Sequence, residues 1–429
     1  MAQRKYQSLL FLLTSSFLLL LLSACSGVGL ANVANQPLLI SVHQTQNVAV
    51  STNCPAPGTG RAAVLPPLTL GKDQNVVYDS NNYASPSSAL KRYDTFTKNS
   101  TTILTLAHRN IDFAQVSADG QWILFVSSGA QQSQIPYKLQ LVRLDGRYLQ
   151  TLFCSPNAAT SINSIQWSTD RKLIVFDFIN SGTQNVDVLN TSNGSIQTDL
   201  SLPTANSYVN VRTWLDTTRI YLTNTLTDAP PNIIYLLDTK KGANQKLSNV
   251  PVVFNGNFSN FDSSYNGKSL YISSCNCGMG GNSGPSTITV MPATGGQSQT
   301  LYSSNTDAIT TVRAVLPTTL LFTVYNYSLN ASSPNSGGAN DNGLWRINSD
   351  GSGLMRLTTD PTGQTSSLNN SSQFPWSNVS RDGSTYNLLT LNGPTGSLEI
   401  GAISGGTPTT IATFGSSGPF LDFVGWTTM

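Results

Sequence analysis

Charged side chains are scarce in this chain. Asp, Glu, Lys and Arg make up 10% of its 429 residues, against about 25% in a typical soluble protein. Ser, Thr, Asn, Gln and Gly take their place, which suits a surface outside the cytoplasm. Without Arg4 and Lys5, near the N-terminus, 21 of the 23 basic residues remain and balance the 21 acidic ones. Nucleic-acid binding requires clustered Lys and Arg, so we expect no nucleic-acid partner.

Histidine is scarcer still, with only His43 and His108. A Ser-His-Asp arrangement requires a His that the fold can bring to the nucleophile, and neither position offers one. The chain has no Gly-x-Ser-x-Gly elbow, phosphate-binding loop or EF-hand pattern. We therefore predict no catalytic residues, no metal site and no cofactor. A binding role is favoured over an enzyme.

The chain has one long hydrophobic run, from Leu9 to Leu22, preceded by Arg4 and Lys5. A positive segment, an apolar segment and a small-residue site are typical of an export signal rather than a spanning helix. The run ends in Leu22-Ser23-Ala24-Cys25, which resembles the lipobox of bacterial lipoproteins. The alternative is an ordinary signal peptide with an incidental Cys.

The lipobox resemblance implies that residues 1–24 are a signal peptide and that the thiol of Cys25 carries acyl chains such as palmitate. Each buried CH₂ of such a chain contributes about 0.8 kcal/mol to membrane binding. We therefore expect an exported protein anchored in a membrane by lipid, at the cell surface or facing the periplasm. Residues 25–68, rich in Pro and Gly after position 54, are expected to form a tether.

From about residue 69 to the C-terminus a strand-turn-strand unit recurs about every fifty residues. Its clearest copies are 116–125 and 167–176, each with Asp in the turn. The turn markers are Asp73, Asp119, Asp170, Asp216, Asn266, Pro317 and Asp382. A repeat of this length made only of strands indicates a β-propeller of four-stranded blades. Seven markers predict seven blades over residues 69–429, with six or eight as alternatives.

The two ends of the repeat region are complementary fragments of one unit. Phe423-Val424-Gly425-Trp426 resembles the first strand of a blade, and the chain ends three residues later. The missing turn and second strand occur instead at 71–78. We therefore predict that the C-terminal strand completes the first blade and closes the ring, which leaves no unpaired sheet edge there.

The repeat also resembles a known family. The Ser-x-Asp-Gly-x-x-Ile-x-Phe pattern around Asp119 and the run 350–358 are similar to the repeats of TolB-like and WD-like propellers. The resemblance covers roughly residues 70–429 and implies the propeller fold. TolB resembles a six-bladed propeller with an added N-terminal domain. Here a short tether stands in that place, so a TolB-specific role is not carried over.

Four cysteines remain after Cys25, an even number that suits disulfides in an exported chain. We favour Cys54–Cys154, which would fasten the tether to an early blade, and Cys275–Cys277, which would close a small ring. Two free thiols are an alternative for the second pair. A metal site there is disfavoured, because few further soft ligands are available.

The recurring Asp and Gly residues are interpreted as turn formers, because they accept backbone hydrogen bonds and allow positive φ. The tryptophans beside these turns are expected to pack between blades: Trp122, Trp167, Trp214 and Trp426.

The loops between the second and third strands vary most in length and should share one rim, where binding residues are expected. The candidate rim residues are Tyr325, Tyr327, Met279 and Trp345.

The sequence thus predicts a lipid-anchored propeller of the cell envelope. It would serve as a binding or scaffold module for a protein or a surface polymer. The first alternative is an extracellular propeller hydrolase or lyase acting on glycans or peptides. The second is a structural spacer or accessory subunit of an envelope complex.

Overall fold

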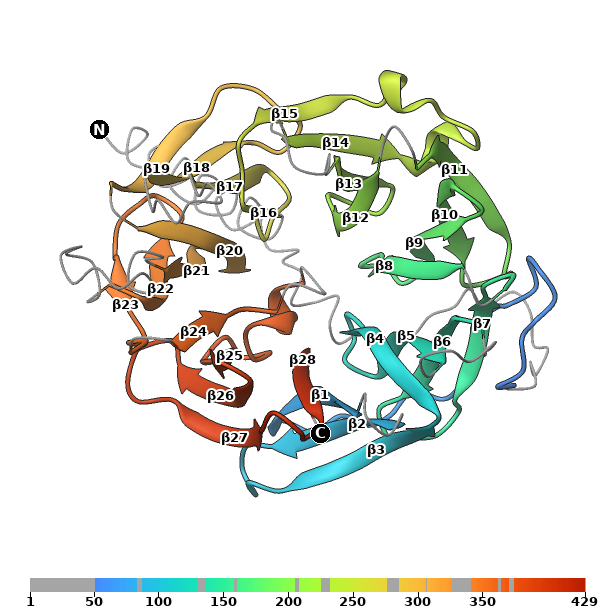
Figure 1. The fold of residues 1–429 in the computed structure, drawn as a ribbon, viewed down its shortest axis with the longest axis horizontal. Helices are drawn as coiled ribbons and strands as arrows, with labels where there is room; N and C mark the ends of the chain where they lie inside the picture. The colour runs from blue at the N-terminus through green and yellow to red at the C-terminus, as the bar shows by residue number, and fades with distance from the viewer. Residues whose placement is uncertain are drawn as a thin grey trace, which may run out of the picture.

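The chain folds into a ring of small sheets (Figure 1). The computed structural model describes residues 51–82, 87–129, 136–157, 160–204, 208–224, 232–275, 285–305, 307–325, 341–361, 364–369 and 374–428. The sheets number seven, each with four antiparallel strands. The fold is a seven-bladed β-propeller, as predicted from the spacing of the turn markers.

The blades follow one another along the chain. Blade 1 contains β28 (Phe420–Thr428), β1 (Gln74–Asn82), β2 (Ser87–Asp94) and β3 (Ser100–Ala107). Blade 2 contains β4 (Arg109–Val116), β5 (Trp122–Gly129), β6 (Lys138–Arg143) and β7 (Gln150–Cys154). Blade 3 contains β8 (Ser161–Trp167), β9 (Leu173–Asn180), β10 (Thr183–Asn190) and β11 (Ile196–Pro203). Blade 4 contains β12 (Val209–Trp214), β13 (Arg219–Asn224), β14 (Asn232–Asp238) and β15 (Val252–Gly256).

The last three blades continue this order. Blade 5 contains β16 (Asn260–Ser263), β17 (Ser269–Cys275), β18 (Ser286–Pro292) and β19 (Gln299–Ser304). Blade 6 contains β20 (Ala308–Leu316), β21 (Thr319–Tyr325), β22 (Gly343–Asn348) and β23 (Met355–Arg356). Blade 7 contains β24 (Gln364–Ser367), β25 (Thr385–Asn392), β26 (Thr395–Ala402) and β27 (Thr409–Phe414). Short 3₁₀ helices lie in the connections: η2 (Thr239–Lys241), η3 (Leu247–Asn249) and η5 (Pro375–Ser377).

The C-terminal strand closes the ring, as predicted. β28 is the first strand of blade 1 and pairs antiparallel with β1, from Gln74 opposite Thr428 to Asn81 opposite Phe420. The contact extends to the next blade, because the hydroxyl of Thr427 donates a hydrogen bond to the carbonyl oxygen of Gly120 over 2.6 Å. The first and last parts of the repeat are therefore joined by main-chain bonds and the first blade leaves no edge at β1.

The turn between the first two strands of a blade has the chemistry expected of its sequence. In blade 3, the Asp170 carboxylate accepts hydrogen bonds from the Ser168 hydroxyl (2.7 Å) and the Lys172 amide (3.1 Å). The Ser168 hydroxyl oxygen in turn accepts from the amide of Leu173. Blades 2, 5 and 7 repeat this with Ser and Asp or Asn two residues apart. The recurring Ser-x-Asp pattern thus supplies the polar groups that satisfy each turn.

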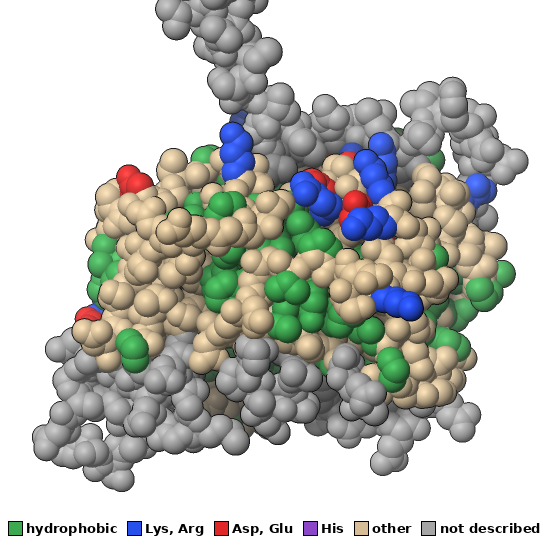
Figure 2. Space-filling view, turned by 90° about the horizontal axis from the view of Figure 1, so that it is seen from above, with side chains coloured by type: hydrophobic (Ala, Val, Ile, Leu, Met, Phe, Trp, Pro, Cys, Tyr) green, Lys and Arg blue, Asp and Glu red, His purple; other side chains and the backbone are tan. Residues whose placement is uncertain are grey.

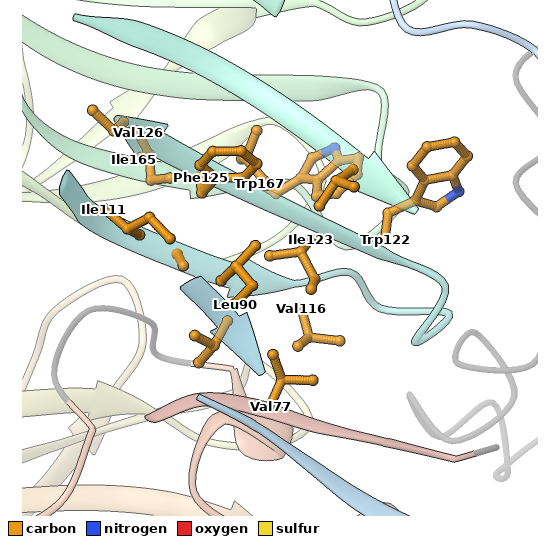
Figure 3. Packing of buried hydrophobic residues seen from close by; sticks show 14 of the residues in the cluster. Val77, Leu90, Ile111, Val116, Trp122, Ile123, Phe125, Val126, Ile165 and Trp167 are labelled. Atoms are coloured by element: carbon orange, nitrogen blue, oxygen red, sulfur yellow. The ribbon is translucent and has the colours of Figure 1, made fainter. Parts of the chain in front are cut away.

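The core lies between neighbouring blades. Figure 3 shows side chains of blades 1, 2 and 3 interleaved, with Trp122 and Trp167 among them. Trp122, Trp167, Trp214 and Trp426 are all buried, so the prediction that they pack between blades is confirmed. Burying a large apolar side chain stabilises the fold by about 1.5–3 kcal/mol.

The segment before blade 1 packs against the outside of blade 2. The amide of Ala63 donates to the side-chain oxygen of Gln150, and that of Leu68 donates to Gln121. The structure also joins Cys54 to Cys154 by a disulfide, the pairing favoured from the sequence, with Cα atoms 5.6 Å apart. Residues 51–70 are therefore fastened to a blade.

The outer wall of the ring is mostly uncharged. In Figure 2 backbone and uncharged polar side chains cover most of the described surface, and the basic side chains gather mainly along the upper rim. No helix in the described part of the chain is long and apolar enough to span a membrane.

Replacing both Cys54 and Cys154 by Ser should lower the free energy of unfolding by about 2–4 kcal/mol, because the bond closes a loop with a sequence separation of 100 residues. Denaturant unfolding in the oxidised state measures this. A variant with both Cys275 and Cys277 replaced by Ser is the control, because it removes the same number of sulfur atoms without opening a long loop. Equal stability of the double variant and the parent chain would contradict a structural role for the bond.

Candidate functional site

Blade 7 departs from the others near the ring axis. Its first strand, β24, is short, and residues 368–379 follow it before the turn at 380–383. We call residues 368–379 the central segment; its residues 370–373 lie outside the described part of the chain. Among its described residues, Phe374, Trp376 and Val379 are buried. The central segment therefore packs inside the ring rather than projecting from it.

Trp376 anchors the central segment to other blades. Its indole N–H donates to the carbonyl oxygen of Val116 in blade 2 over 2.8 Å. Phe374 stacks on its ring at 4.5 Å between centroids, with 12° between planes. The Arg381 guanidinium lies over the same ring at 4.5 Å. Stacked aromatic and cation–π contacts of this kind contribute about 0.5–2 kcal/mol each.

Arg381 links three blades at the same point. Its guanidinium donates to the main-chain oxygens of Trp426 (2.8 Å), Ala118 (2.8 Å) and Ser117 (2.9 Å). These acceptors belong to blade 1 and to the first turn of blade 2, while Arg381 belongs to blade 7. The Arg381 guanidinium therefore holds blade 1, the first turn of blade 2 and the central segment together.

One side of the ring carries all turns between the first and second strands and between the third and fourth strands, because the strands of each blade are antiparallel. We call it the turn face. Its turns are 117–121, 168–172, 215–218, 264–268, 317–318, 380–384, 95–99, 144–149, 191–195, 239–251, 293–298, 349–354 and 403–408, together with 71–73 before β1. The opposite side, with the loops between second and third strands, is the loop face.

Two pockets open on the turn face beside the central segment. The first has a volume of about 450 Å³ and is lined by residues of five blades, including Lys72, Leu316 and Trp376. The second, of about 360 Å³, is lined mainly by turns of blades 3, 4 and 5. Both volumes are within the range of small-ligand sites.

Tyr265 and Pro375 belong to the walls of both pockets, so the pockets adjoin across these two residues. We call the pair of pockets the central groove. Its lining is apolar or aromatic in part and carries Ser and Thr hydroxyls elsewhere. Such a lining can pack against a ligand and fix its orientation through a few hydrogen bonds.

Among the described residues, three carboxylates line the groove, and each is bound within the fold. Asp216 accepts a hydrogen bond from the amide of Thr218 and pairs with Arg219. Asp119 accepts from the Ser117 hydroxyl and the Gln121 amide, and it pairs with Arg171. Asp382 accepts from the Ser380 and Ser384 hydroxyls and from the Ser384 amide. These bonds agree with the interpretation of all three residues as turn formers. Within the described ranges no group of three or more His, Cys, Asp or Glu is placed to hold a metal ion.

The candidate rim residues do not line the groove. Tyr325 ends β21 on the side of the loop face. Trp345 lies within β22, where its ring stacks on Phe322 at 6.4 Å and its N–H donates to the oxygen of Asp341. Tyr327 and Met279 lie outside the described residues, as do Cys277 and the side chain of Cys275. The rim remains a prediction, and the pockets described above open on the opposite side.

Sequence reasoning missed the central segment. The available signal was the gap of 65 residues between the markers Pro317 and Asp382, the longest in the repeat. Part of the excess is the central segment with Phe374, Pro375 and Trp376. The pattern of strands and turns says nothing about where an inserted segment folds, so these residues were not singled out.

A cluster of carboxylates lies deeper in the ring, on β1, β28 and β4. Asp79 is 6% exposed and stands opposite Asp422 in the β1–β28 register. Burial and the charges of Asp422 and Asp112 raise the pKa of Asp79 well above its usual value. Desolvation raises the pKa of Asp422 and of Asp112 to about 6. The cluster therefore binds protons more tightly than the same residues in an unfolded chain.

Blades 5 and 6 bury an arginine close to a carboxylate. The Arg313 guanidinium is buried and donates to the side-chain oxygen of Asn260 (2.5 Å) and to the carbonyl oxygen of Asn369 in the central segment (3.3 Å). Burial raises the pKa of the nearby Asp262 to about 7, although the charge of Arg313 opposes the shift. Arg313 therefore holds the start of the central segment against blade 6.

Comparison with known proteins adds the fold class. No family model matches the chain, and no curated protein matches it. Among solved structures, the β-propeller domain of the Trilobed protease from Pyrococcus furiosus matches with a TM-score of 0.52 at 10% identity, over 82% of this chain and 96% of that one. An acylaminoacyl peptidase matches with a TM-score of 0.52 at 11% identity, over 81% of this chain and 52% of that one.

TolB from Acinetobacter baumannii also matches, with a TM-score of 0.41 at 15% identity, and the match spans 65% of this chain and 62% of TolB. The two matches with a TM-score of 0.52 show a shared β-propeller fold, and identities this low show nothing of activity. The Pyrococcus domain is described as having an open velcro topology. In this chain β28 pairs with β1 and the ring is closed.

The Asp79 pair predicts a pH dependence. Both pKa values are raised in the fold, so the protonated pair stabilises the protein most below about pH 4. This contribution to the free energy of unfolding is lost as the pH rises through 6. Asp79→Asn should therefore raise the free energy of unfolding at pH 8 by on the order of 1–2 kcal/mol, with little effect at pH 4. The Asn oxygen can still accept the bond from Asn81.

Asp94→Asn is the matched control, measured by the same denaturant unfolding. At Asp94, desolvation is outweighed by bonds from the amides of Thr97 and Phe96, and the pKa is lowered. Its replacement should therefore destabilise at pH 8, the opposite sign. If Asp79→Asn instead lowered the free energy of unfolding at pH 8, the charges of the buried pair would not destabilise the fold.

Proposed function

We propose that this protein is an exported, lipid-anchored propeller that binds a protein or surface polymer at the central groove of its turn face. The observation that carries the proposal is the groove itself. Its two pockets meet at Tyr265 and Pro375 and draw their walls from all blades of the ring. A concave, partly apolar surface of this kind on a rigid scaffold is the usual setting for ligand binding.

A binding role fits the chemistry of the groove better than the alternative of a hydrolase or lyase. A general acid or base must be free to exchange a proton with a substrate. In the described groove the carboxylates of Asp119, Asp216 and Asp382 are instead bound by turn amides, and Asp119 and Asp216 are also paired with Arg171 and Arg219. Arg381 is likewise engaged with three main-chain oxygens.

The anchor is proposed from the sequence Leu22-Ser23-Ala24-Cys25. Acylation of Cys25 would place the propeller at a membrane, with residues 26–50 between the lipid and the segment fastened by Cys54. A protein held in this way can present its groove to material of the envelope while the disulfide keeps the tether attached to blade 2.

Cys25→Ala should abolish labelling of the protein by a palmitate analogue, because without the thiol no acyl chain can be attached at this position. Labelling is the readout, since an unprocessed signal segment would itself keep the chain at the membrane. Ser26→Ala, one residue away, should keep the labelling. Unchanged labelling of Cys25→Ala would overturn the anchor proposal.

The groove is tested by photo-cross-linking on intact cells with full-length protein. A photoreactive amino acid at Thr217, an exposed residue lining the second pocket, should yield a discrete adduct with an envelope protein or polymer. The same group at Asn392, which is exposed at the end of β25 on the loop face, is the matched control. Adducts from Asn392 but not from Thr217 would place the binding surface on the loop face and contradict the proposal.

A further inference from the structure

Lysine is distributed unevenly over the ring. Nine lysines lie outside the signal segment. Seven of them are exposed and belong to the turn face: Lys72, Lys98, Lys172, Lys240, Lys241, Lys246 and Lys268. The other two, Lys91 and Lys138, lie in strands β2 and β6. Aspartates also belong to this face, so the lysines give it exposed cations rather than a large net positive charge.

The ammonium groups of these lysines are available to a partner. Among the described residues, only Lys172 of the seven lies near a carboxylate, with Nζ 4.0 Å from Asp170 and 67% of the side chain exposed. The aspartates of the same turns are used internally. Carboxylates that accept amide N–H bonds within their own turns are those of Asp94, Asp145, Asp170, Asp216, Asp238, Asp350 and Asp382. In the turns that hold Lys98, Lys172 and Lys240, the aspartate therefore bonds the backbone while the lysine is exposed to solvent.

Three of the lysines border the central groove. Lys72 lines the first pocket. Lys172 shares its turn with Thr169, and Lys268 follows Gly267, and both of these neighbours line the second pocket. Lys72 thus lines one pocket of the groove, and Lys172 and Lys268 belong to turns that line the other. An extended ligand with repeated negative charges would meet them together, which adds their modest individual contributions.

The lining between the cations suits a polyol. The ring of Tyr265 and the ring of Pro375 offer flat apolar surfaces shared by both pockets. The threonines Thr169 and Thr217 line the second pocket and carry hydroxyls. A sugar ring combines an apolar C–H face with hydroxyls at its edge, so it can pack on the first and hydrogen-bond the second.

We propose that the central groove binds an acidic polysaccharide, with sugar rings packed against Tyr265 and Pro375 and carboxylates paired with Lys72, Lys172 and Lys268. This inference rests on the proposed function and names its ligand class. A bilayer surface fits less well, because a flat membrane would leave the groove empty. The large apolar side chains exposed on the turn face, such as Phe96 and Leu354, stand singly at outer turns.

The test compares polygalacturonate with its fully methyl-esterified form, by titration calorimetry on purified full-length protein in detergent. The two polymers share a backbone and differ in charge. We expect binding of the acid form, binding at least about tenfold weaker for the ester, and a loss of affinity with added salt. Anionic lipid vesicles and duplex DNA at equal charge serve as the other polyanions and should bind more weakly than the acid polymer.

Two pairs of variants locate the site. Lys172→Gln with Lys268→Gln should weaken binding about three- to tenfold, whereas Lys91→Gln with Lys138→Gln removes the same charge elsewhere and should not. Tyr265→Ala should weaken binding, but Tyr148→Ala, on an outer turn of the same face, should not. Thermal unfolding verifies that each variant is folded.

The outcomes separate the two proposals. Equal binding of acid and ester, or tighter binding to vesicles or DNA, would overturn the polysaccharide assignment. Equal losses in the two lysine pairs would overturn its placement in the groove. If no polymer binds while Thr217 still yields an adduct on cells, the ligand class is wrong and the groove stands. If neither occurs, the proposed function falls with it.

Discussion

The pairing of β28 with β1 is the constraint on which the rest of the structure depends. It supplies the first strand of blade 1 from the far end of the chain. Blade 1 is therefore incomplete, as a neighbour for the blades on either side, until the C-terminus docks. The same strand provides the main-chain oxygen of Trp426 that Arg381 binds and the hydroxyl of Thr427 that reaches Gly120. The strand that closes the ring therefore also helps to form the wall of the groove.

The central segment supplies part of the wall of the central groove. Its residues are tied to blade 2 by Trp376, to blade 1 by Asn369 and to blade 6 by Arg313. Seven sheets around an axis would otherwise leave only the ends of their inner strands at the centre. With the segment in place, Pro375 lines both pockets together with Tyr265. An insertion in one blade thereby shapes a surface shared by all of them.

Buried and exposed charges have different roles in this chain. Carboxylates with raised pKa values lie inside the ring, at Asp79, Asp112 and Asp422 in blades 1 and 2 and at Asp262 in blade 5, beside the buried Arg313 of blade 6. The exposed lysines lie on turns, and aspartates of several of these turns accept hydrogen bonds from backbone amides. Desolvation makes buried charge costly unless it is bonded, whereas exposed ammonium groups remain hydrated and free to meet a partner. The exposed lysines of the turn face are therefore the charges with which this weakly charged chain can attract a partner.

The sequence alone determined the blades, because each local choice is repeated. Ser168 and Asp170 satisfy their own turn, as Ser117 and Asp119 do one unit earlier. A buried tryptophan lies beside each of these turns, Trp167 before the one and Trp122 after the other. The sequence also determined that the two ends complete each other, and it favoured the pairing of Cys54 with Cys154. The groove was not accessible in this way. Phe374 and Trp376 break the repeat, and their partners lie as far as 260 residues away. Local pattern specifies strands and turns, but which distant surfaces an irregular segment joins is decided only when the ring closes around it.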